Sequence, residues 1–294
     1  MTILIQNAID AISLGSLYAL FALGVALVFG IMGLINFAHG ELIMAGGYAL
    51  IYLGHPAWPI LVLAMLAIVV ALAIAIERVA FRPVRGANPI TLLVTSFALS
   101  YLLQNLAQLI FGSIPRVTNL STSLSESFTI GSVSVPKLDV VTVGVTILLL
   151  VALTLFLNRT RLGVQMRAAA ENFWMARALG VRANTVIATA FALSGVLAGT
   201  AAILLVAQTA VVTPTMGSSP VLVAFIATIL GGMGSLRGAV LGGFVLGIIT
   251  VALQAYLPLE LRYYRDAFAY GAVIAMLLLR PQGLIVAKSV VTRI

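Results

Sequence analysis

The chain is a succession of apolar runs of about 20 residues, separated by short segments that carry most of its arginines. A helix rises 1.5 Å per residue, so about 20 apolar residues cross the roughly 30 Å of hydrocarbon in a bilayer. Only 8% of the 294 residues are charged and 62% are hydrophobic, whereas about one-quarter of a soluble domain is charged. The predicted fold class is therefore all-α, a single polytopic transmembrane helical bundle over residues 1–294 in a lipid bilayer.

Nine apolar segments are predicted to cross the membrane, and their lengths allow a count of about eight to ten spans. The runs are continuous and do not alternate, which excludes transmembrane strands. Residues 220–235 are short and end in Gly231-Gly-Met-Gly234, so this segment is a candidate for a re-entrant or broken helix. The predicted spans are 6–30, 36–54, 57–76, 90–111, 138–158, 185–207, 220–235, 239–257 and 266–280.

The positive residues predict the orientation, because cytoplasmic loops of membrane proteins carry an excess of Lys and Arg. With nine crossings, the N-terminus is expected outside and the C-terminus in the cytoplasm. Residues 1–6 carry no Lys or Arg, so the first apolar stretch is expected to be a retained span and not a cleaved signal peptide. The expected cytoplasmic residues are Arg78, Arg82, Arg85, Arg159, Arg161, Arg167, Arg177, Arg182, Arg237, Arg280, Lys288 and Arg293, and those outside are Arg116, Lys137, Arg262 and Arg265.

Several function classes are poorly supported. The net charge of +8 lies at the ends of apolar segments, which is the positive-inside pattern and not a basic face for nucleic acid. With His39 and His55 as its only histidines and no cysteine, the chain offers no metal-ligand pair, and it has neither a nucleophile elbow nor a P-loop. We therefore expect no catalytic residue, no metal and no cofactor bound by this chain.

A few polar residues fall within the predicted spans, where charge is costly and is usually functional or paired. Asn36, His39, Glu41, Gln104 and Asn105 are candidates for lining a translocation path. On a helix, Asn36 and His39 would share a face. The alternative, which the sequence favours, is that Asn36 caps the helix and Glu41 lies in its first turn. Further polar residues in or near spans are Asp10, which we expect at the interface, Gln208 and Gln254.

Glycine pairs with the spacing GxxxG recur in the later spans. Because no hydrophobic force draws helices together in lipid, small residues that let backbones approach closely supply the contact. Helix packing is therefore the favoured interpretation, ahead of lining a path. The pairs are Gly195 with Gly199, Gly238 with Gly242, and Gly243 with Gly247.

Two further patterns leave alternatives open. The polar segment 112–137 is predicted to be either a small extracytoplasmic hairpin or a plain loop. The segment Gly30-Ile-Met-Gly33 is similar to Gly231-Gly-Met-Gly234. Many transporters contain internal repeats with glycine-bearing segments at corresponding positions, so a duplication is possible, although such matches also arise by chance.

Residues 159–184 differ from the rest, because they are rich in alanine and arginine and too polar to span. Apolar residues recur there at intervals of three or four, which predicts an amphipathic helix. Such a helix lies on a membrane surface or in a partner's groove, and composition favours the membrane surface. The apolar stripe consists of Leu162, Met166, Ala169, Phe173, Ala176 and Gly180.

This segment resembles the cytoplasmic coupling loop of ATP-binding-cassette importer permeases of the branched-chain amino acid class (LivH type). The matches are Met166-Arg-Ala168, Ala170-Glu-Asn172 and Ala176-Arg-Ala-Leu-Gly-Val181. The chain departs from the family at Trp174 and Met175, where a Glu-Ala pair is typical, so one expected polar contact with the ATPase is in doubt.

Other stretches carry the same resemblance from end to end of the chain. They are Gly15-Ser-Leu-Tyr-Ala-Leu-Phe-Ala-Leu-Gly24, Gly30-Ile-Met-Gly-Leu-Ile-Asn-Phe-Ala-His-Gly-Glu41, Gly231-Gly-Met-Gly-Ser-Leu-Arg-Gly238 and Arg280-Pro-Gln-Gly-Leu284. Arg237 stands where the family commonly has proline.

The resemblance implies a multi-pass permease of a bacterial-type inner membrane that imports leucine, isoleucine and valine. It also implies a second related permease, two cytoplasmic ATPase subunits that bind ATP and magnesium, and an extracytoplasmic substrate-binding protein. Alternatives are import of urea, short amides or other amino acids by the same class, or a stand-alone secondary carrier or channel. The residues expected to couple to the ATPase are Arg167, Ala170, Glu171, Phe173, Ala176, Arg177 and Gly180.

Overall fold

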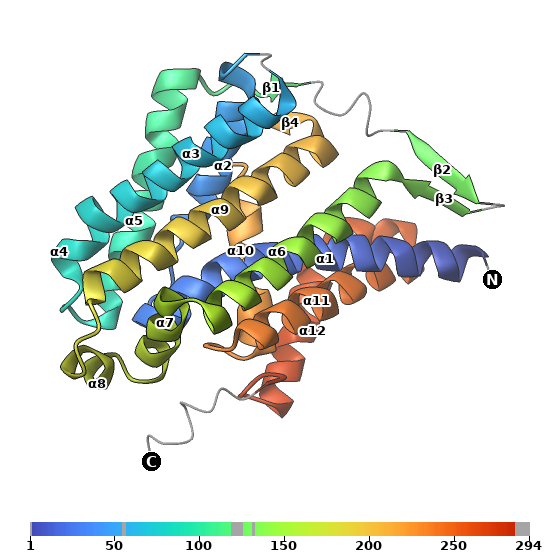
Figure 1. Ribbon diagram of the computed structural model, residues 1–294. Coiled ribbons are helices and arrows are strands. Elements are labelled where there is room, and N and C mark those ends of the chain that lie inside the picture. Colours follow the sequence, from blue (N-terminus) through green and yellow to red (C-terminus); the bar gives the residue numbers. More distant parts are fainter. Residues whose placement is uncertain (1, 55–56, 119–125, 131–132, 286–294) are drawn as a thin grey trace.

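The computed structural model describes residues 2–54, 57–118, 126–130 and 133–285 (Figure 1). Several predictions fall outside these ranges. His55, the polar run 119–125, and the positive residues Lys288 and Arg293 all lie outside the described residues.

Within the described residues, each of the nine predicted apolar segments forms a helix, and the predicted helical class is confirmed. The helices are α1 (Thr2–Met32), α2 (His39–Tyr52), α3 (Trp58–Ile76), α5 (Pro89–Phe111), α6 (Lys137–Arg159), α9 (Ala183–Thr209), α10 (Ser218–Gly231), α11 (Leu236–Tyr256) and α12 (Arg265–Leu279). Shorter elements are the π-helical turn η1 (Glu77–Phe81), α4 (Arg82–Val84), α7 (Arg161–Glu171), α8 (Phe173–Ala178) and the 3₁₀-helix η2 (Leu259–Tyr264).

Six helices of the described chain are long and apolar enough to cross a membrane, fewer than the eight to ten spans expected. α2 and α10 have 14 residues each and α12 has 15, so each is only about 20 Å long. The expected spans 36–54 and 220–235 each include residues that lie outside the helix at one or both ends. Hydropathy does not distinguish such residues from helical ones. The long helices are Ile3–Met32, Trp58–Val84, Pro89–Phe111, Lys137–Arg159, Ala183–Thr209 and Leu236–Tyr256.

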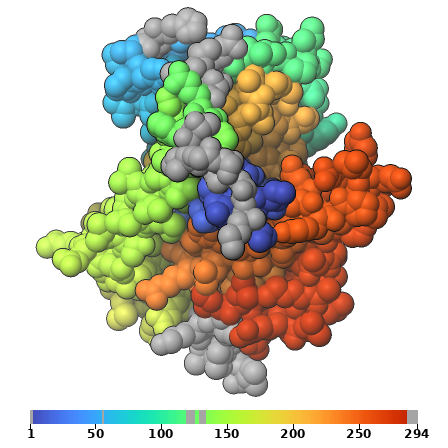
Figure 2. All heavy atoms as spheres, turned by 90° about the vertical axis from the view of Figure 1, so that its right-hand side faces the viewer, coloured from blue at the N-terminus to red at the C-terminus, as the bar shows by residue number. Residues whose placement is uncertain are grey.

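α1 is the central helix of the bundle, and α6, α9, α10 and α11 pack around it (Figure 1). Its segment from Leu17 to Val28 is apolar on all sides and almost entirely buried, as expected for a helix enclosed by others. α5 and α6 instead expose large apolar side chains such as Tyr101, Leu109 and Leu148. In Figure 2, which looks onto the N-terminal end, the start of α1 emerges in the middle of the molecule.

The glycines of the GxxxG pairs each face a neighbouring helix. A Cβ at Gly199 would lie 2.8 Å from Leu66 Cδ2 of α3, which is closer than real Cβ contacts. A Cβ at Gly243 would collide with the backbone of Ala19 in α1. Larger residues would therefore force these helices apart. Gly195 and Gly199 face α3, Gly238 and Gly242 face α10, and Gly243 and Gly247 face α1.

Four short strands form two antiparallel pairs in the described chain. β2 (Ser127–Ile130) pairs with β3 (Val133–Pro136), with Ser127 opposite Pro136, so the hairpin alternative for segment 112–137 is confirmed. β1 (Arg116–Val117) pairs with β4 (Val211–Val212) and ties the end of α5 to the end of α9. Figure 1 shows the hairpin near the N-terminus, with α4, α7 and α8 toward the opposite end.

The two similar glycine-bearing segments lie side by side. Each includes the end of a helix and the turn after it, and each contains a glycine with positive φ, Gly33 at 63° and Gly234 at 90°. A Cβ at Gly30 would lie 4.0 Å from the carbonyl oxygen of Gly234. A duplication stays a hypothesis, because two short turns of one kind also arise independently.

Candidate functional site

The N-terminal ends of the short helices α2 and α10 meet inside the protein. Gly40, in the first turn of α2, lies against Gly217, the residue before α10. A Cβ on either glycine would run into the carbonyl group of the other. The contact therefore requires glycine on both sides, and it places two helix N-termini with their positive dipole ends at one buried point.

A buried carboxyl group, that of Glu41, lies at this point. Glu41 is 0% exposed, and its Oε1 accepts hydrogen bonds from Ser100 Oγ at 2.7 Å and Gln104 Nε2 at 2.8 Å. Gln104 Nε2 also donates to Ser218 Oγ at 3.1 Å. These side chains, which we call the Glu41 cluster, join α2, α5 and α10. Both hydrogen bonds to Glu41 are made by Oε1, whereas Oε2 is buried without a partner among the described residues. Through Oε1 and Gln104 the cluster links the three helices.

Aromatic stacking attaches α5 to α2 and to the turn before α2, on either side of the Glu41 cluster. The rings of Phe37 and Phe97 stack with centroids 4.0 Å apart, and those of Tyr48 and Phe111 with centroids 4.2 Å apart. The rest of α5 is largely exposed. Two aromatic stacks and one polar cluster therefore attach α5 to the bundle, in addition to the β1–β4 pair at its end and its contact with η1.

His39 occupies a separate buried position beside α1 and α9. It is 1% exposed, and its Nδ1 lies 3.0 Å from Ser194 Oγ. Ser194 Oγ also donates to the carbonyl oxygen of Gly24 at 3.1 Å. The imidazole lies so close to Gly24 that a Cβ there would collide with it. Ser194 thus links the start of α2 to the backbone of the central helix.

The structure separates the other expected path residues. Asn36 precedes α2, so it does not share a helix face with His39, and the N-cap residue is Ala38. The Asn36 side chain instead accepts from the Ala38 amide at 3.1 Å in a turn before the helix. Asn105 is turned away from the Glu41 cluster, and its side chain donates to the Tyr101 carbonyl of its own helix. Only Glu41 and Gln104 of the five meet directly.

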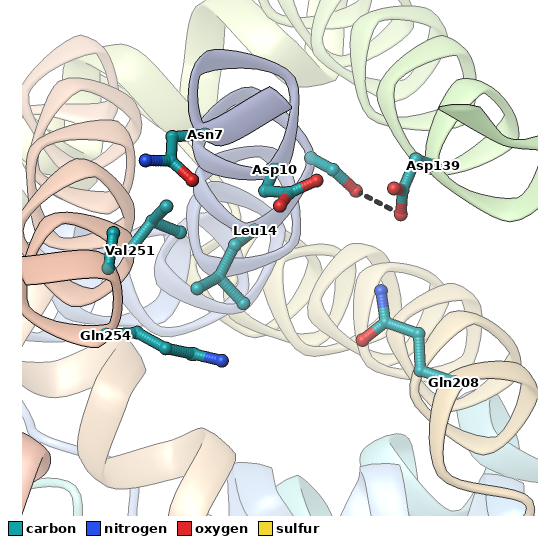
Figure 3. Close-up of a pocket in the computed structure, with 9 residues that line it drawn as sticks. Asn7, Asp10, Leu14, Asp139, Gln208, Val251 and Gln254 are labelled. Atoms are coloured by element: carbon teal, nitrogen blue, oxygen red, sulfur yellow. Dashed lines mark hydrogen bonds between the residues drawn. The ribbon is translucent and has the colours of Figure 1, made fainter. Parts of the chain in front are cut away.

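A second polar site is a cavity of about 330 Å³ at the N-terminal end of α1 (Figure 3). Asp10 and Asp139 both face it, and Ser13 Oγ donates to Asp139 Oδ1 at 2.8 Å. Sequence reasoning selected Asp10, Gln208 and Gln254 one by one but missed Asp139. No sequence spacing could have grouped these residues, because they come from four separate helices, α1, α6, α9 and α11. The lining polar residues are Asn7, Asp10, Ser13, Asp139, Gln208 and Gln254.

The segment 159–184 forms two helices, α7 and α8, and not the single helix that its apolar stripe predicts. The break is at Asn172, which has an extended backbone and whose Oδ1 accepts from the Met175 amide to cap α8. Met166, Ala169 and Ala176 are buried against the bundle. At the N-terminal turn of α7, a Cβ on Gly163 would collide with the backbone of α6. These contacts fix the segment to the bundle.

The outward face of α7 and α8 carries large apolar side chains. Trp174, Met175 and Leu179 are 76%, 59% and 80% exposed, and the guanidinium of Arg177 lies 5.9 Å from the centre of the Trp174 ring. Of the seven expected coupling residues, Ala176 is buried, Ala170 and Phe173 are half-buried, and Arg167, Glu171, Arg177 and Gly180 are exposed. Gly180 has φ +90°. Residues with a side chain rarely adopt this conformation, so a glycine ends the helix here.

The chain matches known proteins along nearly its whole length. The family described as "Branched-chain amino acid transport system / permease component" matches residues 7–278. The high-affinity branched-chain amino acid transport system permease protein BraD of Pseudomonas aeruginosa is 37% identical, over 96% of this chain and 95% of BraD. LivH of Escherichia coli is 38% identical with the same coverage. The probable LivH of Methanocaldococcus jannaschii is 28% identical over 93% of this chain and 90% of its own length. No solved structure matches.

The Glu41 cluster predicts different effects for two adjacent residues of α5. Gln104→Ala removes the side chain that bridges Glu41 and Ser218, and we expect it to lower the free energy of unfolding by about 1–3 kcal/mol. Asn105→Ala removes a hydrogen bond within the helix alone, so we expect a change of less than about 0.5 kcal/mol. Denaturation of the purified variants in detergent measures both. Equal losses would show that Gln104 does not hold α5 in place.

Proposed function

The chain belongs to the family of branched-chain amino acid transport permeases, and we propose that with a second related permease it forms the membrane path of an ATP-driven importer of leucine, isoleucine and valine. As a member of this family it is a multi-pass inner-membrane permease and a non-catalytic subunit. Its partners are ATPase subunits and a substrate-binding protein. We propose two cytoplasmic ATPases, which bind ATP and magnesium, and one extracytoplasmic binding protein.

The observation that carries this proposal is the apolar outward face of α7 and α8. Lipid does not explain it fully, because the exposed Arg177 lies among these apolar side chains, and Arg167 and Glu171 are exposed on the adjoining α7. Trp and Arg are typical anchors of protein interfaces. We propose that Trp174, Met175 and Leu179 enter a groove on the ATPase, while Ala176 and Phe173 hold α8 to the bundle. Movement of the ATPase would then be transmitted to the bundle through α7.

We propose nine crossings, with the N-terminus outside and the C-terminus in the cytoplasm. The short helices α2 and α10 are completed by the non-helical stretches 33–38 and 210–217, in which Leu34, Phe37 and Val212 are buried. Irregular backbone is tolerated at membrane depth only where protein encloses it. The end of the molecule with α4, α7 and α8 carries most of the arginines, which supports a cytoplasmic position for it.

We propose that the translocation path runs beside the Glu41 cluster. In transporters, broken helices commonly place their N-termini at the substrate site near the middle of the membrane. The meeting of the N-termini of α2 and α10, with Gly40 against Gly217, supports this proposal. The exposed α5, which Gln104 connects to both helices, is then in a position to face the second permease.

Charge on the α8 surface is expected to prevent docking. Trp174→Glu and Leu179→Glu each place an unpaired carboxylate in the proposed contact, which costs several kcal/mol when buried. We expect co-purification of the ATPase with the permease to fall by at least about tenfold, and uptake to be lost. Trp174→Phe and Leu179→Met, which keep the apolar surface, should retain both. Normal co-purification in the two charged variants would contradict docking at this face.

The path proposal predicts a transport defect without loss of assembly. Glu41→Gln keeps the shape and an acceptor for Ser100 and Gln104 but removes the carboxyl group, so we expect uptake to fall about tenfold. ATPase co-purification should be unchanged, because Glu41 is remote from the α8 surface. If Glu41→Gln supports the same uptake as the unchanged chain, the role of Glu41 is purely structural.

Reconstitution in vesicles tests the importer as a whole. We expect leucine uptake to require ATP, the ATPases, the second permease and the binding protein together, and the purified chain alone to hydrolyse no ATP. Isoleucine and valine should compete with leucine, whereas urea and acetamide should not. Uptake by this chain alone would instead identify a carrier or channel, and competition by urea would identify a different cargo.

A further inference from the structure

A cavity of about 820 Å³ opens at the end of the molecule that holds α4 and α8. It lies between the turn after α3, helix α8 and the start of α9. Aspartate and glutamate are absent from its lining, which includes the apolar residues Leu92, Phe173 and Ile187. Its four basic lining residues are Arg82, Arg85, Arg177 and Arg182.

Only one of these four guanidinium groups is paired with a carboxylate in the part of the chain that the structure describes. Arg85 forms an ion pair with the buried Glu77 and donates to Asn184 Oδ1 at 2.7 Å. Arg82 and Arg182 are exposed and form no ion pair with any described residue. Several like charges that line one cavity repel each other, and a bound anion relieves that repulsion.

The start of α9 adds to the positive potential of this cavity. The residue before the helix is Arg182, whose side chain does not cap it. Ala183, Asn184 and Thr185 of the first turn line the cavity, so the positive end of a 27-residue helix opens onto it. Amide groups at a helix start favour phosphate and other anions, although this feature alone would not define a site.

A second cavity continues the first along the spanning helices. Its volume is about 400 Å³, and it shares Arg82, Asn184 and Thr185 with the arginine cavity. It extends between α3 and α9, where Ile74 and Ala188 line it together with Ala192. Glu77, Arg78 and Thr189 line the same groove, and Glu77 is paired with Arg85. The basic cavity at the end of the bundle is therefore joined to a groove on two membrane-spanning helices whose apolar part is formed by Ile74, Ala188 and Ala192.

We propose that the two cavities together bind one anionic phospholipid from the adjoining leaflet. Its phosphate lies between Arg82 and Arg182, and one acyl chain lies in the groove between α3 and α9. Basic pockets between spanning helices on the cytoplasmic side bind lipid head groups. The groove distinguishes a lipid from free phosphate or an acidic peptide, because neither of those has an apolar chain to place between Ile74 and Ala188.

Native mass spectrometry of the full chain in detergent tests this site. Phosphatidylglycerol and phosphatidylcholine with identical acyl chains are titrated separately. We expect phosphatidylglycerol to bind at least about tenfold more tightly, and Arg82→Gln with Arg182→Gln to abolish the difference, since each arginine near a lipid surface contributes a few-fold. Arg82→Lys with Arg182→Lys should restore it. Arg161→Gln, an exposed arginine of α7 outside the cavity, is the matched control and should bind as the unchanged chain does.

Two further measurements identify the molecule that binds in the cavities. Ala188→Phe fills the groove, so it should weaken phosphatidylglycerol binding several-fold, and inorganic phosphate at millimolar concentration should not displace the lipid. Displacement by phosphate, or unchanged binding in Ala188→Phe, would overturn the lipid assignment in favour of a small-anion site. Loss of the bound lipid on assembly with the ATPase subunits would overturn it in favour of a protein contact. Equal binding of both lipids would show that there is no anionic site.

Discussion

Inside a bilayer no water is available to hydrogen-bond a bare backbone, so any stretch of chain without helical structure must be enclosed by protein. In the proposed arrangement of nine crossings, this constraint governs the two stretches 33–38 and 210–217, which precede the short helices α2 and α10. Both helices start in the interior, where Gly40 and Gly217 bring two backbones into direct contact. The long helices α1 and α9 enclose this point, and His39 binds to both through Ser194 and Gly24.

Besides the buried pair His39 and Ser194, three polar regions of the bundle have different positions. The Glu41 cluster holds α2, α5 and α10 together in the interior. The cavity with Asp10 and Asp139 lies at the N-terminal end. At the opposite end, the arginines of the cavity between α4, α8 and α9 lie close to the apolar surface of α8. A permease that passes a signal from α8 to the path would use the helices between these regions as rigid connections.

Much of the fold followed from sequence patterns that depend on local physics. Each apolar run became a helix, because a continuous run of this length in lipid has no other way to satisfy its backbone. The strand pair β2–β3 was one of two alternatives for its segment. Part of the apolar stripe predicted for residues 159–184 is the face buried against the bundle, at Met166, Ala169 and Ala176, whereas the outward apolar face was not predicted. The site was predicted less well. Gln104 and Asn105 are adjacent and chemically similar, yet only Gln104 reaches Glu41, and nothing in the sequence separates them.

The sequence by itself determined that most of this protein's surface faces lipid, that its fold is helical, and to which family it belongs, since hydropathy and motifs are local properties of the chain. Only the tertiary structure decided that α2 and α10 are too short to cross alone, because helix length depends on where the backbone leaves the helix and not on hydropathy. It also decided that Asp139 and Asp10 line one cavity, and that Arg82 and Arg182 line another. Those residues are far apart in the chain, and only the packing of separate helices brings their side chains to one cavity.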